Sequence, residues 1–172
     1  MPFWVVSVLV WGLSASPLWA AEPVEPLDLR PATNRAALEC DLSVAEFGVW
    51  TMLWSDKAAL AAAGVQKVPA LNASTLQYRL TQPVTLRDFA TGQTVSTDTI
   101  ALRAMQLFAV VDGQQDSALS AHLGAREPRT LNETDILGQT VTVTKTRLIK
   151  PLPDASGQPV PGRLLLGCDY GR

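Results

Sequence analysis

His122 is the only histidine of the chain, and histidine is the side chain best suited to acid–base catalysis near neutral pH. Ser117 and Ser120 lie close to it in the sequence, so a hydrolase with a serine nucleophile is one hypothesis. However, the Gly-x-Ser-x-Gly pattern that places such a serine on a sharp turn does not occur. We therefore expect His122 to be a surface or helix-end residue, and we expect no catalytic residue.

Carboxylates offer a second route to hydrolysis, because a pair of them can act as general acid and general base. They fall into two groups, Glu39, Asp41 and Glu46, and Glu127, Glu133 and Asp135. Glu46 lies in an apolar run, so it is the acid that we expect to be partly buried. A solvated or ion-paired role is more common for such residues. A small hydrolase that uses His122 or a carboxylate pair therefore remains an alternative function.

Trp50 and Trp54 are the only tryptophans outside the first 20 residues. Their spacing of four positions puts both rings on one face of either a helix or a strand. Two aromatic rings on one face can stack on a sugar ring or hold a protein partner. Tryptophans more often fill a core. Trp50 and Trp54 are therefore candidate binding residues, with the core as their other expected location.

No pattern in the sequence indicates a metal, a nucleotide or a nucleic acid. Two cysteines and one histidine are too few for a structural zinc site. The chain has no Walker A loop, no Gly-x-Gly-x-x-Gly motif after a strand and no Cys-x-x-Cys motif. Its 14 basic and 16 acidic residues give a net charge of −2, which lacks the basic excess of a nucleic-acid binder. We expect no cofactor, no metal and no nucleic-acid partner.

The first 37 residues are predicted to lie outside the folded domain. Residues 1–20 have the pattern of a secretory signal peptide, with an apolar run, a helix-breaking Pro17 and a cleavage site after Ala20. The apolar run is shorter than the roughly 20 residues that a transmembrane helix needs, so no span is expected in the mature chain. Residues 21–37 contain three prolines and are predicted to form an extended Pro-rich arm.

Residues 38–172 are predicted to form a single β-rich domain that a Cys40–Cys168 disulfide closes. Both cysteines share a face with apolar residues in segments that we expect to be strands, Cys40 with Leu42 and Val44 in 38–44, and Cys168 with Leu164 and Leu166 in 163–169. Cysteines of exported proteins usually pair, because their compartment is oxidising. The bridge would then make the first and last strands neighbours, or place them face to face across the core.

Alternating or apolar segments bounded by turn residues predict the other elements. Further strands are expected at 75–81, 84–89, 100–111 and 140–149, and the apolar run 47–54 would continue the first strand. Short helices are expected at 57–63, 117–123 and the capping-box pattern Thr130–Glu133. The predicted fold is mainly β, an antiparallel sandwich or partly closed barrel with two or three short helical insertions.

The sequence predicts an exported, non-enzymatic protein of the cell envelope, periplasmic or secreted. It would act through contacts with another envelope protein, for example as an assembly or accessory factor. An inhibitor or small-ligand-binding β-barrel, with Trp50 and Trp54 at its site, is an alternative to this function. An open sheet edge would favour assembly, a deep apolar mouth would favour a ligand, and a polar cleft around His122 would favour catalysis.

Export can be tested on the protein isolated from cells. Cleavage after Ala20 predicts an intact mass that corresponds to a chain beginning at Ala21. Recovery of the uncleaved chain from the cytoplasm would contradict export.

Overall fold

The computed structural model describes residues 27–69, 72, 74–87, 94–112 and 128–171. The predicted signal peptide, residues 21–26 of the predicted arm and His122 lie outside these residues. The described helices are α1 (Pro31–Leu38), α2 (Val44–Leu53) and α3 (Lys57–Ala62). The described strands are β1 (Gln66–Val68), β2 (Leu76–Arg87), β3 (Thr94–Arg103), β4 (Gln106–Asp112), β5 (Arg129–Thr134), β6 (Thr140–Pro153) and β7 (Pro159–Gly171). Among these helices, none is long and apolar enough to cross a membrane.

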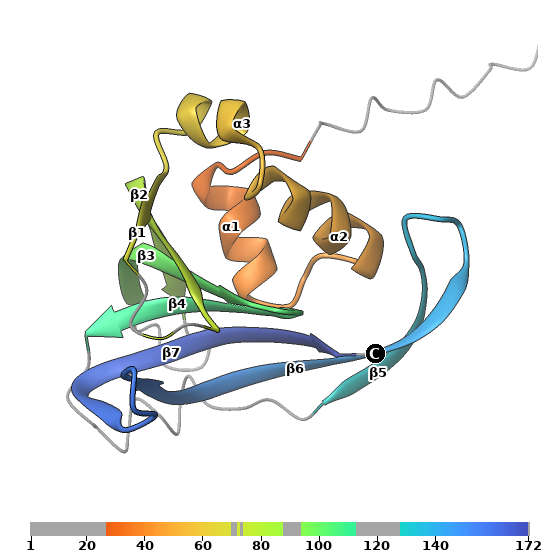
Figure 1. Ribbon diagram of the computed structural model, residues 1–172. Coiled ribbons are helices and arrows are strands. Elements are labelled where there is room, and N and C mark those ends of the chain that lie inside the picture. The colour runs from red at the N-terminus through yellow and green to blue at the C-terminus, as the bar shows by residue number, and fades with distance from the viewer. Residues whose placement is uncertain (1–26, 70–71, 73, 88–93, 113–127, 172) are drawn as a thin grey trace, which may run out of the picture.

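The seven strands form one antiparallel sheet in the order β1-β2-β3-β4-β7-β6-β5. The sheet is strongly bent, and α1 and α2 lie on its concave side (Figure 1). A mainly β fold with antiparallel strands and three short helices confirms the predicted fold class. A layer of helices covers the concave face in place of a second sheet, and the sheet is not closed.

The main core lies between the concave face and the two longer helices. The residues on this face alternate along each strand, as the period of a β-strand requires. The central strands β4 and β7 contribute Leu107, Ala109, Val111, Leu164, Leu166, Cys168 and Tyr170. The helices contribute Ala37, Leu38, Phe47, Trp50 and Trp54 from the opposite side. Each of these side chains is buried, so this interface supplies the largest share of the hydrophobic stabilisation.

A smaller cluster of buried hydrophobic residues lies on the convex face, beside the β6–β7 hairpin. It consists of Ala101, Phe108, Val110, Leu152 and Leu165, with Leu148 and Val160 packed against it. The strands predicted at 140–149 and 163–169 are longer in the structure, because β6 and β7 continue through most of residues 150–162. The turn itself is short, because the Asp154 carboxylate accepts hydrogen bonds from the backbone N–H groups of Ser156 and Gln158.

The sequence-based prediction was wrong for residues 31–54, which form α1 and α2 rather than an extended arm and a strand. Pro31 opens α1, a position where its missing N–H removes no hydrogen bond of the helix. Ser43 and Glu46 form a capping box at the start of α2. Between the helices Cys40 adopts a φ of 66°, which turns the chain. The prolines and the apolar alternation were therefore misleading in this region.

Three other predictions differ from the structure, and one agrees. The strand predicted at 100–111 is divided between β3 and β4, which are joined by a turn at Ala104 and Met105. Pro83 does not separate two strands, because β2 runs through it with an irregular register between Arg79 and Val84. The Thr130–Glu133 pattern lies in β5 and does not cap a helix. The predicted helix at 57–63 is present as α3, capped by Asp56. Gly64 follows it with a φ of 65°, as expected for a residue that ends a helix.

The Cys40–Cys168 disulfide is present, and it joins residues 128 positions apart in the sequence. Its Cα atoms are 5.3 Å apart, and both cysteines are buried. The prediction that it joins the first and last strands was wrong, because Cys40 lies in the turn between α1 and α2. The bridge therefore ties the helical layer to the central strand β7.

Replacing both cysteines with alanine should lower the free energy of unfolding by about 2–5 kcal/mol, because the ring constrains most of the domain in the unfolded state. Urea denaturation of the oxidised wild type and the double variant measures this difference. Reducing agent should lower the melting temperature of the wild type and leave that of the variant unchanged. A loss below about 1 kcal/mol would contradict the stabilising role of the bridge.

Candidate interaction surface

Trp50 and Trp54 lie in the core and do not form a surface site. Both are buried, Trp50 within α2 and Trp54 directly after its last residue, and the Trp50 Nε1–H donates a hydrogen bond to Asn34 Oδ1 of α1 at 3.2 Å. Their rings lie in a continuous row of aromatic contacts, in the order Tyr170, Phe47, Trp50, Trp54 and Tyr78. This row runs from β7 through α2 to β2, so the two tryptophans attach α2 to the concave face.

Of the candidate catalytic residues, Asp41, Glu46 and Glu133 lie near the Tyr170 hydroxyl, whose pKa is raised by burial and further by these three charges. His122, Ser117, Ser120 and Glu127 lie outside the part of the chain that the structure describes. Glu46 accepts a hydrogen bond from the Ser43 N–H at 2.7 Å as part of the capping box. Asp135 accepts hydrogen bonds from the N–H groups of Leu137 and Gln139 in the β5–β6 turn. No group of histidine, cysteine or acidic residues suited to a metal ion occurs among the described residues.

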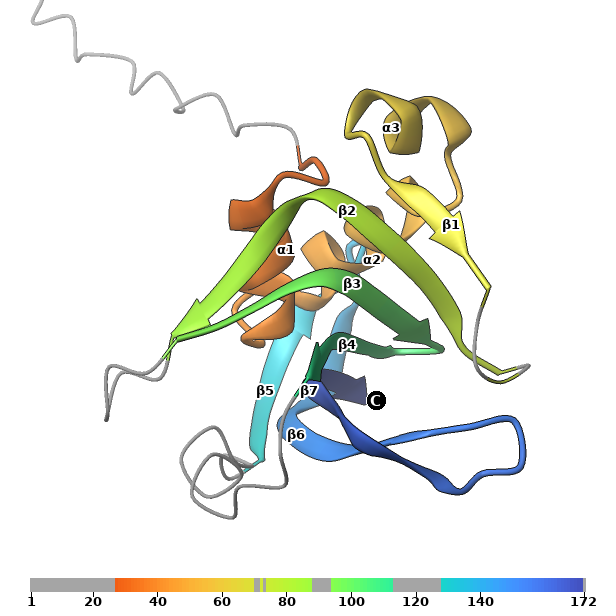
Figure 2. The same ribbon diagram turned by 90° about the vertical axis from the view of Figure 1, so that its left-hand side faces the viewer.

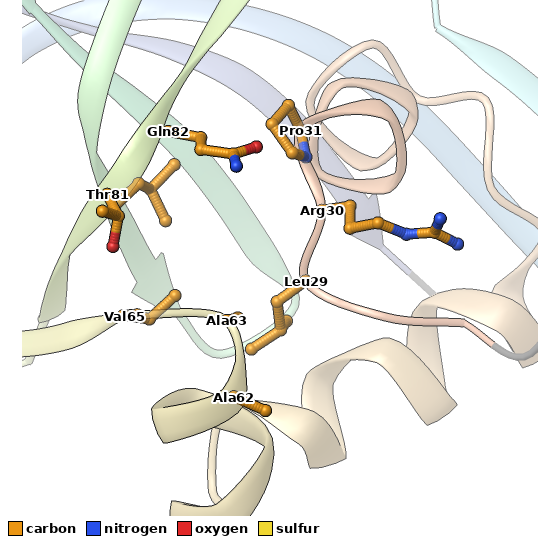
Figure 3. Close-up of a pocket in the computed structure, with 9 residues that line it drawn as sticks. Leu29, Arg30, Pro31, Ala62, Ala63, Val65, Thr81 and Gln82 are labelled. Atoms are coloured by element: carbon orange, nitrogen blue, oxygen red, sulfur yellow. The ribbon is translucent and has the colours of Figure 1, made fainter.

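Three depressions lie on the surface between the start of α1, α3 and β2. Figure 3 shows the first, where Leu29 and Pro31 face Ala63, Val65 and Gln82. The volumes of the three are about 140, 300 and 250 Å³. Ligand sites are usually about 300–1,000 Å³ and enclose most of the ligand. These shallow depressions are therefore poor candidates for a small-molecule site.

The described residues expose six large hydrophobic side chains, and five of them lie on two adjoining elements. Val49 and Met52 lie on α2, and Leu131, Ile136 and Leu137 lie on the β5–β6 hairpin. We call these five residues the α2–β5 face. Met52 is 56% exposed and Leu137 is 75% exposed. Exposed hydrophobic residues gathered on adjoining elements are typical of a protein-interaction site.

The two halves of the α2–β5 face are in contact. A Cβ atom added at Gly48 of α2 would lie 3.2 Å from Ile136 Cγ2, so the hairpin packs directly against the helix. The end of the β5–β6 hairpin curves up beside α2 (Figure 1). The helix and the hairpin therefore present one surface, although residues 49 and 137 are far apart in the sequence.

A buried ion pair fixes the hairpin to the start of α2. Lys145 Nζ lies 2.5 Å from Glu133 Oε1, and the two side chains are only 5% and 15% exposed. Glu133 Oε2 also accepts a hydrogen bond from the Val44 N–H at 2.5 Å, where the partial positive charge of the helix N-terminus favours a carboxylate. Glu133 on β5 therefore neutralises a buried lysine and satisfies an N–H group of α2 that has no partner within the helix.

Side chains of three strands donate hydrogen bonds to the helix junction, which we define as residues 37–44. Tyr170 Oη donates to the Ala37 carbonyl at 2.9 Å, and Lys145 Nζ donates to the Leu42 carbonyl at 2.7 Å. Arg129 Nη2 donates to the Cys40 carbonyl at 3.3 Å. Burial of Tyr170 raises the pKa of its hydroxyl, so this hydroxyl stays protonated and can donate. The junction is thus held by β5, β6 and β7 together.

Sequence reasoning missed the α2–β5 face because it assigned α2 as a strand. The signal that could have revealed it is the Ser43-x-x-Glu46 capping pattern, which predicts a helix with Val49 and Met52 on one side. The hairpin half of the face has no local signal, since its proximity to α2 is a property of the fold.

Comparison with known proteins gives no relative. No protein-family model, no curated protein and no solved structure matches the chain.

Removing one charge of the buried ion pair should destabilise the protein strongly. Lys145→Met leaves the Glu133 carboxylate without its cation, and the expected loss is about 3–5 kcal/mol. Adding Glu133→Gln should recover part of this loss, because the amide oxygen can still accept from the Val44 N–H without a buried charge. Urea denaturation of both variants provides the test. A double variant less stable than Lys145→Met would show that the unpaired charge is not the cause.

Proposed function

We propose that this chain is an exported, non-enzymatic protein of the cell envelope that acts by binding another envelope protein. The α2–β5 face is the observation that carries the proposal. Its five exposed hydrophobic residues lie on a helix and a hairpin that are in contact at Gly48 and Ile136, and their desolvation by a partner would favour association. The buried disulfide fits an oxidising compartment, which supports the periplasmic or secreted location.

The ion pair and the hydrogen bonds at the helix junction add to this proposal. They hold α2 and the hairpin in one arrangement before any partner arrives. A preorganised surface loses less conformational entropy on binding than a mobile one. The α2–β5 face is therefore suited to a defined partner with a complementary apolar surface.

The alternatives have less support in the described residues. A ligand-binding barrel needs an open interior, whereas α1 and α2 fill the concave side of the sheet with buried side chains. The hydrolase alternative depends on His122 or on a carboxylate pair. His122 lies outside the described residues, and Glu46, Glu133 and Asp135 each have a structural hydrogen-bonding role.

Site-specific photocrosslinking in cells tests the proposal. A photoreactive phenylalanine analogue at Met52 or Leu137 should form a light-dependent adduct with one envelope protein. The same analogue at Leu76 is the matched control, because this leucine is also exposed but lies outside the α2–β5 face. Leu137→Lys should abolish the adduct from position 52, since it places a charge in the apolar contact. Identical adducts from all three positions, or none from the face, would contradict the proposal.

A further inference from the structure

Several strand edges are unpaired in the described part of the chain, and those on β1 and on the second half of β2 have features that prevent pairing. β1 is only three residues long and carries Lys67 at its centre. The second half of β2, beyond its pairing with β1, contains Pro83, which has no N–H to donate. Short length, lysine and proline are the usual protections of an edge strand.

The edge on β5 lacks these protections. β5 pairs with β6 along its whole length, Arg129–Thr134, and it is the last strand in the sheet order. Figure 2 shows that no described strand lies beyond it. Neither lysine nor proline occurs within it. Among the described residues, nothing pairs with the β5 edge, which can therefore accept another strand.

The register identifies the backbone groups that this edge offers. The Asp135 N–H donates to the Gln139 carbonyl, so Asp135 and Gln139 lie in a hydrogen-bonded position of the hairpin. Hydrogen-bonded positions alternate along an antiparallel pair. The backbone N–H and C=O groups of residues 129, 131 and 133 therefore point toward β6. The N–H and C=O groups of Thr130, Asn132 and Thr134 then point outward from the sheet.

The side chains of β5 are complementary to those of a second β5. The side chains of Arg129, Leu131 and Glu133 lie on the side of the sheet that faces the helices, because Arg129 and Glu133 both bond to the helix junction. In an antiparallel pair centred on Leu131, each Arg129 lies opposite a Glu133, and the two Leu131 side chains meet. Thr130 lies opposite Asn132, and both use outward backbone groups. Opposite charges at facing positions stabilise a strand pair, whereas like charges would destabilise it.

Existing contacts leave capacity for these interactions. Arg129 is exposed, and its guanidinium has five N–H donors, of which one bonds to the Cys40 carbonyl. A carboxylate has about four lone-pair sites, and Glu133 uses its two oxygens for Lys145 and the Val44 N–H. Leu131 is 40% exposed and can bury more surface.

We propose that a second copy of this chain docks on β5, so that two seven-stranded sheets join about a twofold axis at Leu131. This axis is perpendicular to the sheet, so both copies present their helices on the same side. The two α2–β5 faces then adjoin across the axis. The inference goes beyond the proposed function, because the occupant of the edge is another copy of the chain and not a different envelope protein.

Sedimentation equilibrium of the oxidised mature chain over a range of concentrations tests the dimer. The wild type should sediment as a dimer at the higher concentrations. Asn132→Pro removes one outward N–H without removing a bond to β6, and it should raise the dimer Kd at least about tenfold. Asn132→Ala keeps this N–H and is the matched control, which should remain dimeric. Circular dichroism and the urea midpoint verify that each variant is folded.

A second pair of variants covers the case in which Asn132→Pro does not fold. Leu131→Lys places two like charges together at the twofold axis and should give a monomer, whereas Leu76→Lys, at an exposed leucine elsewhere, should stay dimeric. A wild type that is monomeric at every concentration would overturn the inference, as would a dimer that withstands Leu131→Lys. A monomer that still forms the specific photoadduct from Met52 would overturn the dimer and leave the proposed function intact.

Discussion

The attachment of the helices to the sheet depends on one short segment, the helix junction at residues 37–44. Backbone groups at the ends of helices have no partners within the helix and must find them elsewhere. Here the sheet supplies them, through side chains of β5, β6 and β7 that bond to the carbonyls of Ala37, Cys40 and Leu42 and to the Val44 N–H. The disulfide adds a covalent link at the same point. The hydrogen bonds from the sheet and the disulfide thus hold the same segment.

This concentration of contacts makes the two ends of the molecule different. At the junction end, the ion pair and the packing of Ile136 on Gly48 hold the β5–β6 hairpin against α2. At the far end, α3 has no buried residue and borders the shallow depressions (Figure 3). The exposed apolar face and the open β5 edge both lie at the firmly held end. A rigid surface is better suited to specific binding, because less ordering is required when a partner arrives.

Local sequence signals predicted part of this structure well. The alternation of Val141 to Ile149 gave a correct strand, Asp56 gave a correct helix start, and the two cysteines pair as expected. Residues 38–54 were misassigned because α2 is apolar on nearly all sides and so lacks a clear helical period. The Ser43–Glu46 and Thr130–Glu133 segments share one capping pattern, yet only the first caps a helix. Long-range pairing with β6 and the contact of Glu133 with α2 decide the second, and neither is visible locally.

Hydrogen exchange of backbone amides in a Tyr170→Phe variant tests the role of the junction most directly. The change removes the hydroxyl that donates to the Ala37 carbonyl but keeps the ring stacked on Phe47. A lost hydrogen bond of this kind weakens the attachment by about 1 kcal/mol. We predict that the amides of α1 and α2 exchange several-fold faster, while those of β3 and β4 are unchanged. Equal acceleration in the helices and the central strands, or none in the helices, would contradict the claim that the junction holds the helical layer on the sheet.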